Sequence, residues 1–227
     1  MHPKLWGNRG NHGPVLPVVS LTLGVFPKNE IWLASSVWQI HSCGNGLLTH
    51  ILVAEGYEGY GIDLRARTSW VHYPQTTQAA LRVYAFDPTE EETNGDGATS
   101  SRSTYFKSGT FIIGNHADEL TPWLPVLSNL YNSSGYISIP CCSWAFDKKY
   151  ERSSTPTFPL PNSESGLRPE SDSAFVESLN LGGDGSNKSS YSMYRIWLAS
   201  LSLHCGWQVE CETLRIPSTR NWAIIGS

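Results

Sequence analysis

The stretch CGNGLL at residues 43–48 gives the strongest indication of the fold of this chain. Its two glycines, Gly44 and Gly46, lie between two apolar segments, and Asp63 follows seventeen positions after Gly46. In a doubly wound α/β sheet, a glycine turn opens the helix after the first strand, and an acid at the end of the next strand hydrogen-bonds a ribose. The stretch therefore predicts a site for an adenosine-containing cofactor. The alternative is an ordinary tight turn with a surface or helix-capping acid.

Short apolar runs and helical patterns alternate from residue 37 onward. We predict a strand at Val37 to Ser42, a helix at Leu47 to Glu55 and a strand at Tyr60 to Asp63, which together form a βαβ unit. The apolar residues of this helix, which we expect to share its buried face, are Leu47, Leu48, Ile51 and Leu52.

The same alternation continues to the end of the chain. The further predicted strands are Leu81 to Phe86, Thr110 to Gly114, Tyr136 to Ile139, Trp207 to Leu214 and Asn221 to Ile225, with helices after Pro122 and from Tyr191 to Cys205. Alternation favours parallel pairing, whereas the last two strands form an antiparallel hairpin. By its layout this is an α/β, mostly parallel, doubly wound sheet of the Rossmann-like class I methyltransferase type.

Three segments interrupt this pattern. Residues 1–36 show no clear period and stay unassigned, and Asp87 to Lys107 is rich in acids and glycine, which predicts a solvated loop. The insertion at residues 151–190 is dominated by Ser, Pro, Gly and charge, so we expect little fixed structure there beyond a turn of helix at Ala174 to Leu179. Residues 37–227, including the loop and the insertion, are expected to form one domain.

Composition bounds the class of protein. The 227 residues include 40% hydrophobic residues and nine Trp, enough for a buried core. No apolar run reaches the length of a membrane span, and the first residues lack the layout of a signal peptide, so we expect a cytoplasmic protein with no membrane contact. Five cysteines without a C-x-x-C pair favour neither a disulfide framework nor a four-ligand zinc site.

The net charge of −4 and the pI near 6.0 do not indicate a nucleic-acid-binding protein. Any RNA contact is therefore expected to be local or assisted by a partner. The basic residues nearest the predicted site are Arg65, Arg67, Lys148, Lys149 and Arg152, with Arg215 and Arg220 flanking the final turn. Phosphate contact and ordinary surface ion pairing are both open for them.

A second group of polar residues follows the strand that is predicted at Thr110 to Gly114. The ionisable or amide side chains there are Asn115, His116, Asp118 and Glu119. Ligands of open α/β sheets bind at the carboxyl ends of the strands, so these groups are candidates for a general base or for orienting a nucleophile. The alternative is that Glu119 or Thr121 caps the helix that starts near Pro122.

A third group, Cys141, Cys142 and Trp144, follows the next strand and is expected at the same edge. The two thiols could line a substrate pocket, but we favour simple packing, because buried reduced cysteine is common and inert. Trp144 and Trp123 could stack a base or belong to the core.

Three blocks of sequence resemble the AdoMet-dependent tRNA (uracil-2'-O-)-methyltransferase family, which modifies uridine 44 of serine tRNA. They are CGNGLLTHILVAEGYEGYGIDLRARTSW at 43–70, FIIGNHADELTPWLPVLS with SIPCCSWAFDKKY between 111 and 150, and LHCGWQVECETLRIPSTRNWAIIG at 203–226. The resemblance implies methyl transfer from S-adenosyl-L-methionine to a ribose 2'-hydroxyl of a tRNA. It implies cofactor contacts at Cys43, Gly44, Asn45, Gly46 and Asp63, and an active-site edge at Asn115, His116, Asp118 and Glu119.

Two features of the chain leave open how the hydroxyl is activated and whether the protein has a different function. No residue matches the lysine-centred tetrad of some ribose methyltransferases, so activation falls to a carboxylate, to His116 or to alignment alone. Ile40 and Ser42 stand where such enzymes usually have an acid and a glycine. This departure motivates the alternative of a non-catalytic RNA- or partner-binding module. The net charge favours a third reading, a methyltransferase that acts on a protein or small molecule.

Overall fold

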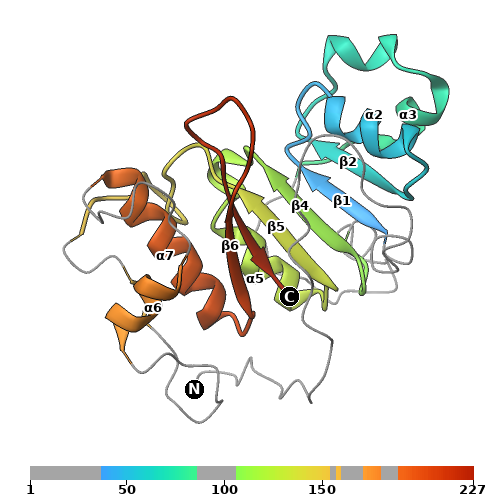
Figure 1. Cartoon of the computed structure of the whole chain (residues 1–227). Helices are drawn as coiled ribbons and strands as arrows, with labels where there is room; N and C mark the ends of the chain where they lie inside the picture. The colour runs from blue at the N-terminus through green and yellow to red at the C-terminus, as the bar shows by residue number, and fades with distance from the viewer. Residues whose placement is uncertain (1–36, 86–105, 154–156, 160–170, 180–188) are drawn as a thin grey trace.

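The computed structural model describes residues 37–85, 106–153, 157–159, 171–179 and 189–227. The predictions for residues 1–36, for nearly all of the acidic loop and for most of the 151–190 insertion lie outside these residues. The described parts form one sheet with helices packed on it (Figure 1).

The sheet has seven strands in the spatial order β3-β2-β1-β4-β5-β7-β6. The strands are β1 (Trp38–His41), β2 (Gly59–Asp63), β3 (Leu81–Val83), β4 (Phe111–Asn115), β5 (Gly135–Ile139), β6 (Val209–Thr213) and β7 (Trp222–Gly226). Strands β1 to β5 pair in parallel, whereas β7 is antiparallel to both β5 and β6. The predicted class I methyltransferase fold, with its C-terminal hairpin, is confirmed.

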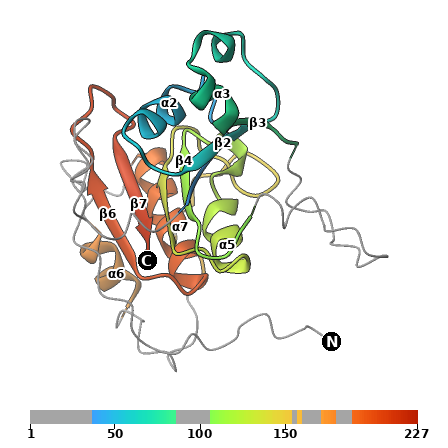
Figure 2. The ribbon, with the colours of Figure 1, turned by 90° about the vertical axis from the view of Figure 1, so that its right-hand side faces the viewer.

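Helices cover the sheet in two groups. The α-helices are α2 (Leu47–Ala54), α3 (Gln75–Ala80), α5 (Trp123–Leu130), α6 (Asp172–Ser178) and α7 (Ser190–His204), and the 3₁₀ turns are η1 (Thr68–His72) and η2 (Asp118–Leu120). Helices α5 and α7 contact each other and the β4, β5 and β6 strands, while α2 and α3 pack together on β2 (Figures 1 and 2). Sequence analysis missed η1 and α3, because the polar run of α3 carries no apolar period.

The chain crosses the sheet in opposite directions from its centre. It passes from β1 through α2 to β2, and from β4 through α5 to β5, on the other side of β1. Because parallel crossovers are right-handed, the helices of these two halves lie on opposite faces of the sheet. The connections therefore diverge between β1 and β4, which is where open α/β sheets bind ligands.

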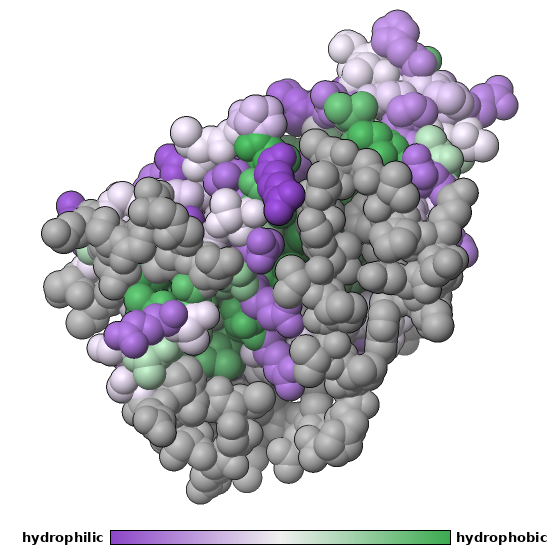
Figure 3. Space-filling model, viewed as in Figure 1, coloured by the Kyte–Doolittle hydropathy of each residue, from purple (hydrophilic) through white to green (hydrophobic). Residues whose placement is uncertain are grey.

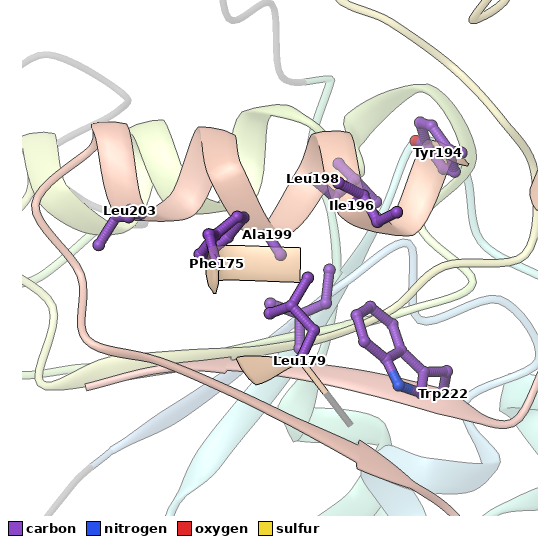
Figure 4. Packing of buried hydrophobic residues seen from close by; sticks show 9 residues of the cluster. Phe175, Leu179, Tyr194, Ile196, Leu198, Ala199, Leu203 and Trp222 are labelled. Atoms are coloured by element: carbon purple, nitrogen blue, oxygen red, sulfur yellow. The ribbon is translucent and has the colours of Figure 1, made fainter. Parts of the chain in front are cut away.

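One core cluster lies between α7 and the hairpin strand β7. Tyr194, Ile196 and Leu198 of α7 pack with Trp222 of β7, and all four are at most 2% exposed. Phe175 and Leu179, from α6 and its end, lie between α7 and the strand that carries Trp222 (Figure 4).

The insertion is therefore more structured than the sequence predicts. The expected turn of helix is the helix α6, and its Phe175 is 3% exposed. The backbone N–H of Phe158 donates a hydrogen bond of 2.6 Å to Ser200 Oγ of α7. Apolar residues spaced within a polar segment thus attach parts of the insertion to the core.

The buried face of α2 differs from the predicted one. Leu52 is 2% exposed, but Leu47 and Ile51 are 51% and 36% exposed, so the prediction for these two residues was wrong. The cause is the close approach of α2 to β2. A Cβ on Gly61 would lie 2.2 Å from Thr49 Oγ1, so the helix contacts the strand through Thr49 and Leu52. Figure 3 shows apolar surface where Figure 1 places α2.

Candidate active site

The glycine turn connects β1 to α2 in the predicted way. Gly44 and Gly46 have positive φ angles of 56° and 82°, which glycine adopts without steric cost. Gly46 is buried and directly precedes α2. A Cβ at Gly46 would lie 3.1 Å from Leu81 Cδ2 and 3.3 Å from Trp70 Nε1. Both the backbone angle and the space therefore require glycine at this position.

Asp63 holds this turn from the end of β2. Its Oδ2 accepts the backbone N–H of Gly44 at 2.8 Å. Its Oδ1 accepts a hydrogen bond from Arg67 Nη2 at 3.2 Å and a longer one from the Arg65 N–H at 3.4 Å. The carboxylate is buried at 5% exposure, and a buried charge needs such partners. Asp63 is thus beside the glycine turn, as the sequence predicts, and it fixes the turn's backbone.

The 3₁₀ turn η1 covers the carbonyl side of the glycine turn. Trp70 Nε1 donates to the Gly44 carbonyl and Ser69 Oγ donates to the Asn45 carbonyl, each at 2.9 Å. Asn45 is exposed, and its Oδ1 accepts the Leu47 N–H at 3.1 Å. Sequence reasoning missed Ser69 and Trp70, because no local motif links them to a turn 24 to 26 positions earlier.

The second predicted group lies at the end of β4. The N–H of His116 donates to the Ile139 carbonyl of β5 at 3.1 Å, and His116 and Asp118 have positive φ angles of 57° and 46°. The side chains of His116, Asp118 and Glu119 are exposed, and Asn115 is half-buried. They are therefore accessible to a ligand at this edge.

The helix-capping alternative for this group was wrong. Helix α5 begins after Pro122, and no side chain caps it. Asp118 and Glu119 instead form the first residues of η2, which precedes α5.

The third group is only partly packed. Cys141 is half-buried, and its thiol donates a hydrogen bond of 3.1 Å to Asp118 Oδ1. Partial burial, reinforced by this hydrogen bond, raises the pKa of Cys141 to about 12, so the group is a neutral thiol. Cys142 is exposed, so the favoured packing role was wrong for this residue. Trp123 packs at the edge of a core cluster, with its ring 4.8 Å from that of Phe146.

Two cationic side chains lie on aromatic rings near this edge. Lys149 Nζ is 3.7 Å from the centre of the Trp144 ring, and Arg220 lies 3.9 Å from the centre of the Tyr191 ring. The hydroxyl of Tyr191 donates to the Pro140 carbonyl at 2.8 Å, which places this pair beside Cys141. Arg220 is therefore closer to the candidate site than its position in a hairpin turn indicates.

These groups share one edge of the sheet. The glycine turn, Asp63, the 115–119 segment and Cys141 follow β1, β2, β4 and β5, which are neighbouring parallel strands. The carboxyl ends of neighbouring parallel strands lie at one edge. The arrangement brings a glycine turn and the Asp63 carboxylate, which suit a nucleotide-like ligand, to the same edge as ionisable side chains that can carry out acid–base chemistry.

Comparison with known proteins agrees with this arrangement. A family described as "Predicted AdoMet-dependent methyltransferase" matches residues 34–88, which contain the glycine turn and Asp63. The chain is 38% identical over 206 residues to a tRNA (uracil-O(2)-)-methyltransferase of Schizosaccharomyces pombe, covering 81% of this chain and 34% of that protein. The resemblance to this methyltransferase family is confirmed.

Two further tRNA (uracil-O(2)-)-methyltransferases match the same share of this chain. A tRNA (uracil-O(2)-)-methyltransferase of Neurospora crassa is 36% identical over 198 residues, covering 81% of this chain and 34% of that protein. A probable tRNA (uracil-O(2)-)-methyltransferase of Homo sapiens is 33% identical over 186 residues, covering 81% of this chain and 18% of that protein. The chain thus spans about a third or less of these relatives. No solved structure matches it.

Ile40 and Ser42 stand where such methyltransferases usually have an acid and a glycine, and the structure shows how the chain accommodates both residues. Ile40 is 1% exposed and packs with Trp38 and Leu52. Ser42 has a φ of 55°, in the left-handed region that the usual glycine would adopt freely. A serine thus occupies a left-handed backbone position just before this turn, and Asp63 is the carboxylate that binds the Gly44 N–H.

No helix in the described ranges combines the length and the apolar character that a bilayer crossing requires.

Proposed function

We propose that this chain is the AdoMet-binding catalytic domain of a tRNA methyltransferase that methylates the ribose 2'-hydroxyl of a uridine, at position 44 of serine tRNA. The observation that carries the proposal is the Asp63-supported glycine turn, which shares one sheet edge with the 115–119 segment. The similarity to tRNA (uracil-O(2)-)-methyltransferases over 81% of the chain supports this substrate class. The predicted cytoplasmic location is part of the same proposal.

The turn and Asp63 form the cofactor half of the site. We assign cofactor contacts to Cys43, Gly44, Asn45, Gly46 and Asp63. Asp63 fits a ribose diol because each of its carboxylate oxygens has two lone pairs that can accept hydrogen bonds. The diol can therefore donate to Asp63 beside the Gly44 amide or in place of the exposed Arg67. When bound, AdoMet supplies a methyl group on a sulfonium, which is open to in-line attack.

The 115–119 segment forms the acceptor half. Asn115 orients the attacking hydroxyl, and Glu119 contributes negative charge at the same edge. His116, Asp118 and Glu119 are the candidate bases, because all three are exposed after the end of β4 and each can accept a proton. Alignment of the hydroxyl contributes to the rate in each case.

The RNA contact is local, in keeping with the net charge of −4. Lys149 on Trp144 and Arg220 on Tyr191 place two cations on aromatic surfaces near the acceptor half. Such pairs combine phosphate attraction with a stacking surface for an unstacked base. A protein partner that adds basic surface remains part of the proposal.

The decisive experiment incubates the protein with methyl-labelled AdoMet and either total tRNA or total protein. We expect label in tRNA, at a nucleotide whose 3' phosphodiester resists alkali, because a methylated 2'-oxygen cannot attack the phosphate. Label in an alkali-sensitive nucleotide would place the methyl group on the base. Label in protein alone would favour the third reading of the sequence, and the absence of saturable AdoMet binding would favour the non-catalytic module.

Cofactor binding is tested by calorimetry on Asp63→Asn and Asp63→Ala. We expect AdoMet affinity to fall about 10- to 100-fold, because hydrogen bonds to a charged acceptor contribute about 1.5–3 kcal/mol. Glu58→Ala is the matched control, because Glu58 is an exposed acid at the other end of the same strand. Unchanged affinity in both Asp63 variants would remove this residue from the cofactor site.

The base is identified by comparing His116→Ala, Asp118→Asn and Glu119→Gln, together with the His116→Ala/Asp118→Asn/Glu119→Gln triple variant. We expect the variant that lacks the base to lose methylation about 100-fold or more while it still binds AdoMet. Full activity in all of these variants would move the chemistry away from this edge.

A further inference from the structure

Asp118, Cys141 and Cys142 each offer one ligand atom to a common point. One carboxylate oxygen and the two Sγ atoms all lie within 4.8 Å of one another. Asp118 belongs to η2 after β4, and the two cysteines follow β5. Two thiols and a carboxylate from neighbouring strand ends therefore meet at the edge of the sheet.

This spacing is close to that of a metal site. Zinc binds cysteine sulfur at about 2.3 Å and carboxylate oxygen at about 2.0–2.2 Å in tetrahedral geometry, so its ligand atoms lie roughly 3.5–4 Å apart. The Cys141 Sγ and Asp118 Oδ1 atoms are already 3.1 Å apart. Small side-chain rotations suffice to bring all three ligands onto one ion.

The backbone around the cysteines is held by contacts outside the cluster. The Trp144 N–H donates to the Cys142 carbonyl at 3.1 Å, within a bend at Cys142 that turns adjacent side chains toward the same point. Tyr191 holds the Pro140 carbonyl from α7 at 2.8 Å. Adjacent residues of an extended strand point to opposite faces, so the bend is what allows both thiols to serve one ion.

We propose that Asp118, Cys141 and Cys142 bind a thiophilic divalent cation such as Zn²⁺, with solvent in the fourth position. Each thiol releases its proton to solvent on coordination, which leaves two thiolates and one carboxylate around the ion. Thiolate ligands select zinc over magnesium or calcium, which prefer oxygen ligands. Because Asp118 would then be a ligand, the ion-bound protein leaves His116 and Glu119 as the candidate bases.

The test uses Co²⁺ as a spectroscopic substitute for Zn²⁺ on the reduced protein, without AdoMet or RNA, so its outcome is independent of the proposed methyl transfer. We expect a thiolate-to-cobalt charge-transfer band that saturates at one ion per chain and disappears when Zn²⁺ is added. Cys141→Ser and Cys142→Ser should each abolish the band. Asp118→Asn should weaken Co²⁺ affinity at least tenfold.

Cys211→Ala is the matched control, because this half-buried cysteine lies on β6 in the core and should leave the band unchanged. No band in the wild type, or a band that survives in the Cys141→Ser/Cys142→Ser double variant, would overturn the proposal.

Alkylation of the exposed Cys142 in the wild type, followed by mass spectrometry, provides a measurement that needs no variant. Zn²⁺ should slow the reaction at least tenfold, and an equal rate with and without Zn²⁺ would also overturn the proposal.

Discussion

Ser42 has a backbone φ angle that is unfavourable for a residue with a Cβ atom. Its φ of 55° lies in the left-handed region, which costs a residue with a Cβ about 1–2 kcal/mol. The neighbouring contacts keep it there, because the Cys43 N–H donates to the Ile62 carbonyl at 2.9 Å and so holds the chain beside β2. The serine at this position therefore carries local backbone strain.

We predict that Ser42→Gly stabilises the protein. The expected gain is about 0.5–1 kcal/mol in the free energy of unfolding, since relief of the left-handed strain exceeds the extra chain entropy of glycine. Urea unfolding measures it. Ser42→Ala is the control, because alanine keeps the Cβ and should bring no gain. A destabilised Ser42→Gly would mean that the serine hydroxyl contributes more than the strain costs.

At the scale of elements, helix α5 and strand β4 set the position of the 115–119 segment. They meet at a glycine, because a Cβ on Gly114 would lie 2.0 Å from Leu124 Cδ1. Leu124 is fully buried in a core cluster, so its displacement would disturb the side chains that pack around it. The close approach therefore fixes how far the end of β4 lies from the helix that follows it.

We predict that Gly114→Ala destabilises the protein by about 1–3 kcal/mol, the usual cost of overpacking a core. In a Leu124→Ala background the same change should cost much less, because the clashing methyl group is gone. A double-mutant cycle by urea unfolding measures this coupling. Additive costs would show that the strain at Gly114 arises from the backbone and not from Leu124.

At the scale of the whole molecule, stability depends on a histidine that is buried at the end of the interior strand β1. His41 is 2% exposed, Gln39 Nε2 lies 3.0 Å from its Nε2, and its ring stacks on Phe106. Burial lowers the pKa of His41 from 6.5 to about 4, because the charged ring loses its solvation. The folded protein therefore holds this histidine neutral.

The consequence is a loss of stability in mild acid. Between about pH 6.5 and pH 4 the unfolded chain binds a proton at His41 that the folded chain does not, so this contribution is complete above that window and is lost as the pH falls through it. The total is roughly 3 kcal/mol. Urea unfolding from neutral to mildly acidic pH measures it, with His41→Gln as the non-titrating control. Equal pH dependence in both proteins would contradict the prediction.

Sequence and structure agree closely for the elements and less closely for the contacts between them. The glycine turn, the helix after it and the strand that ends at Asp63 were predicted within one residue or two. The buried face of α2 was not, because the apolar period cannot reveal that Gly61 admits Thr49 so closely. The helix α6 was underestimated, because only packing against α7 makes its short apolar pattern stable.

For the candidate site, the residues that end the parallel strands and the positions that need glycine could be predicted from the sequence. These properties are local, since they follow from side-chain periodicity and from the φ angles that a turn demands. The tertiary structure alone decided that Asp63 binds the Gly44 amide, that Trp70 covers the turn, and that Cys141 meets Asp118. These contacts join segments about 20 or more positions apart, so their distances depend on the twist of the sheet and the packing of its helices.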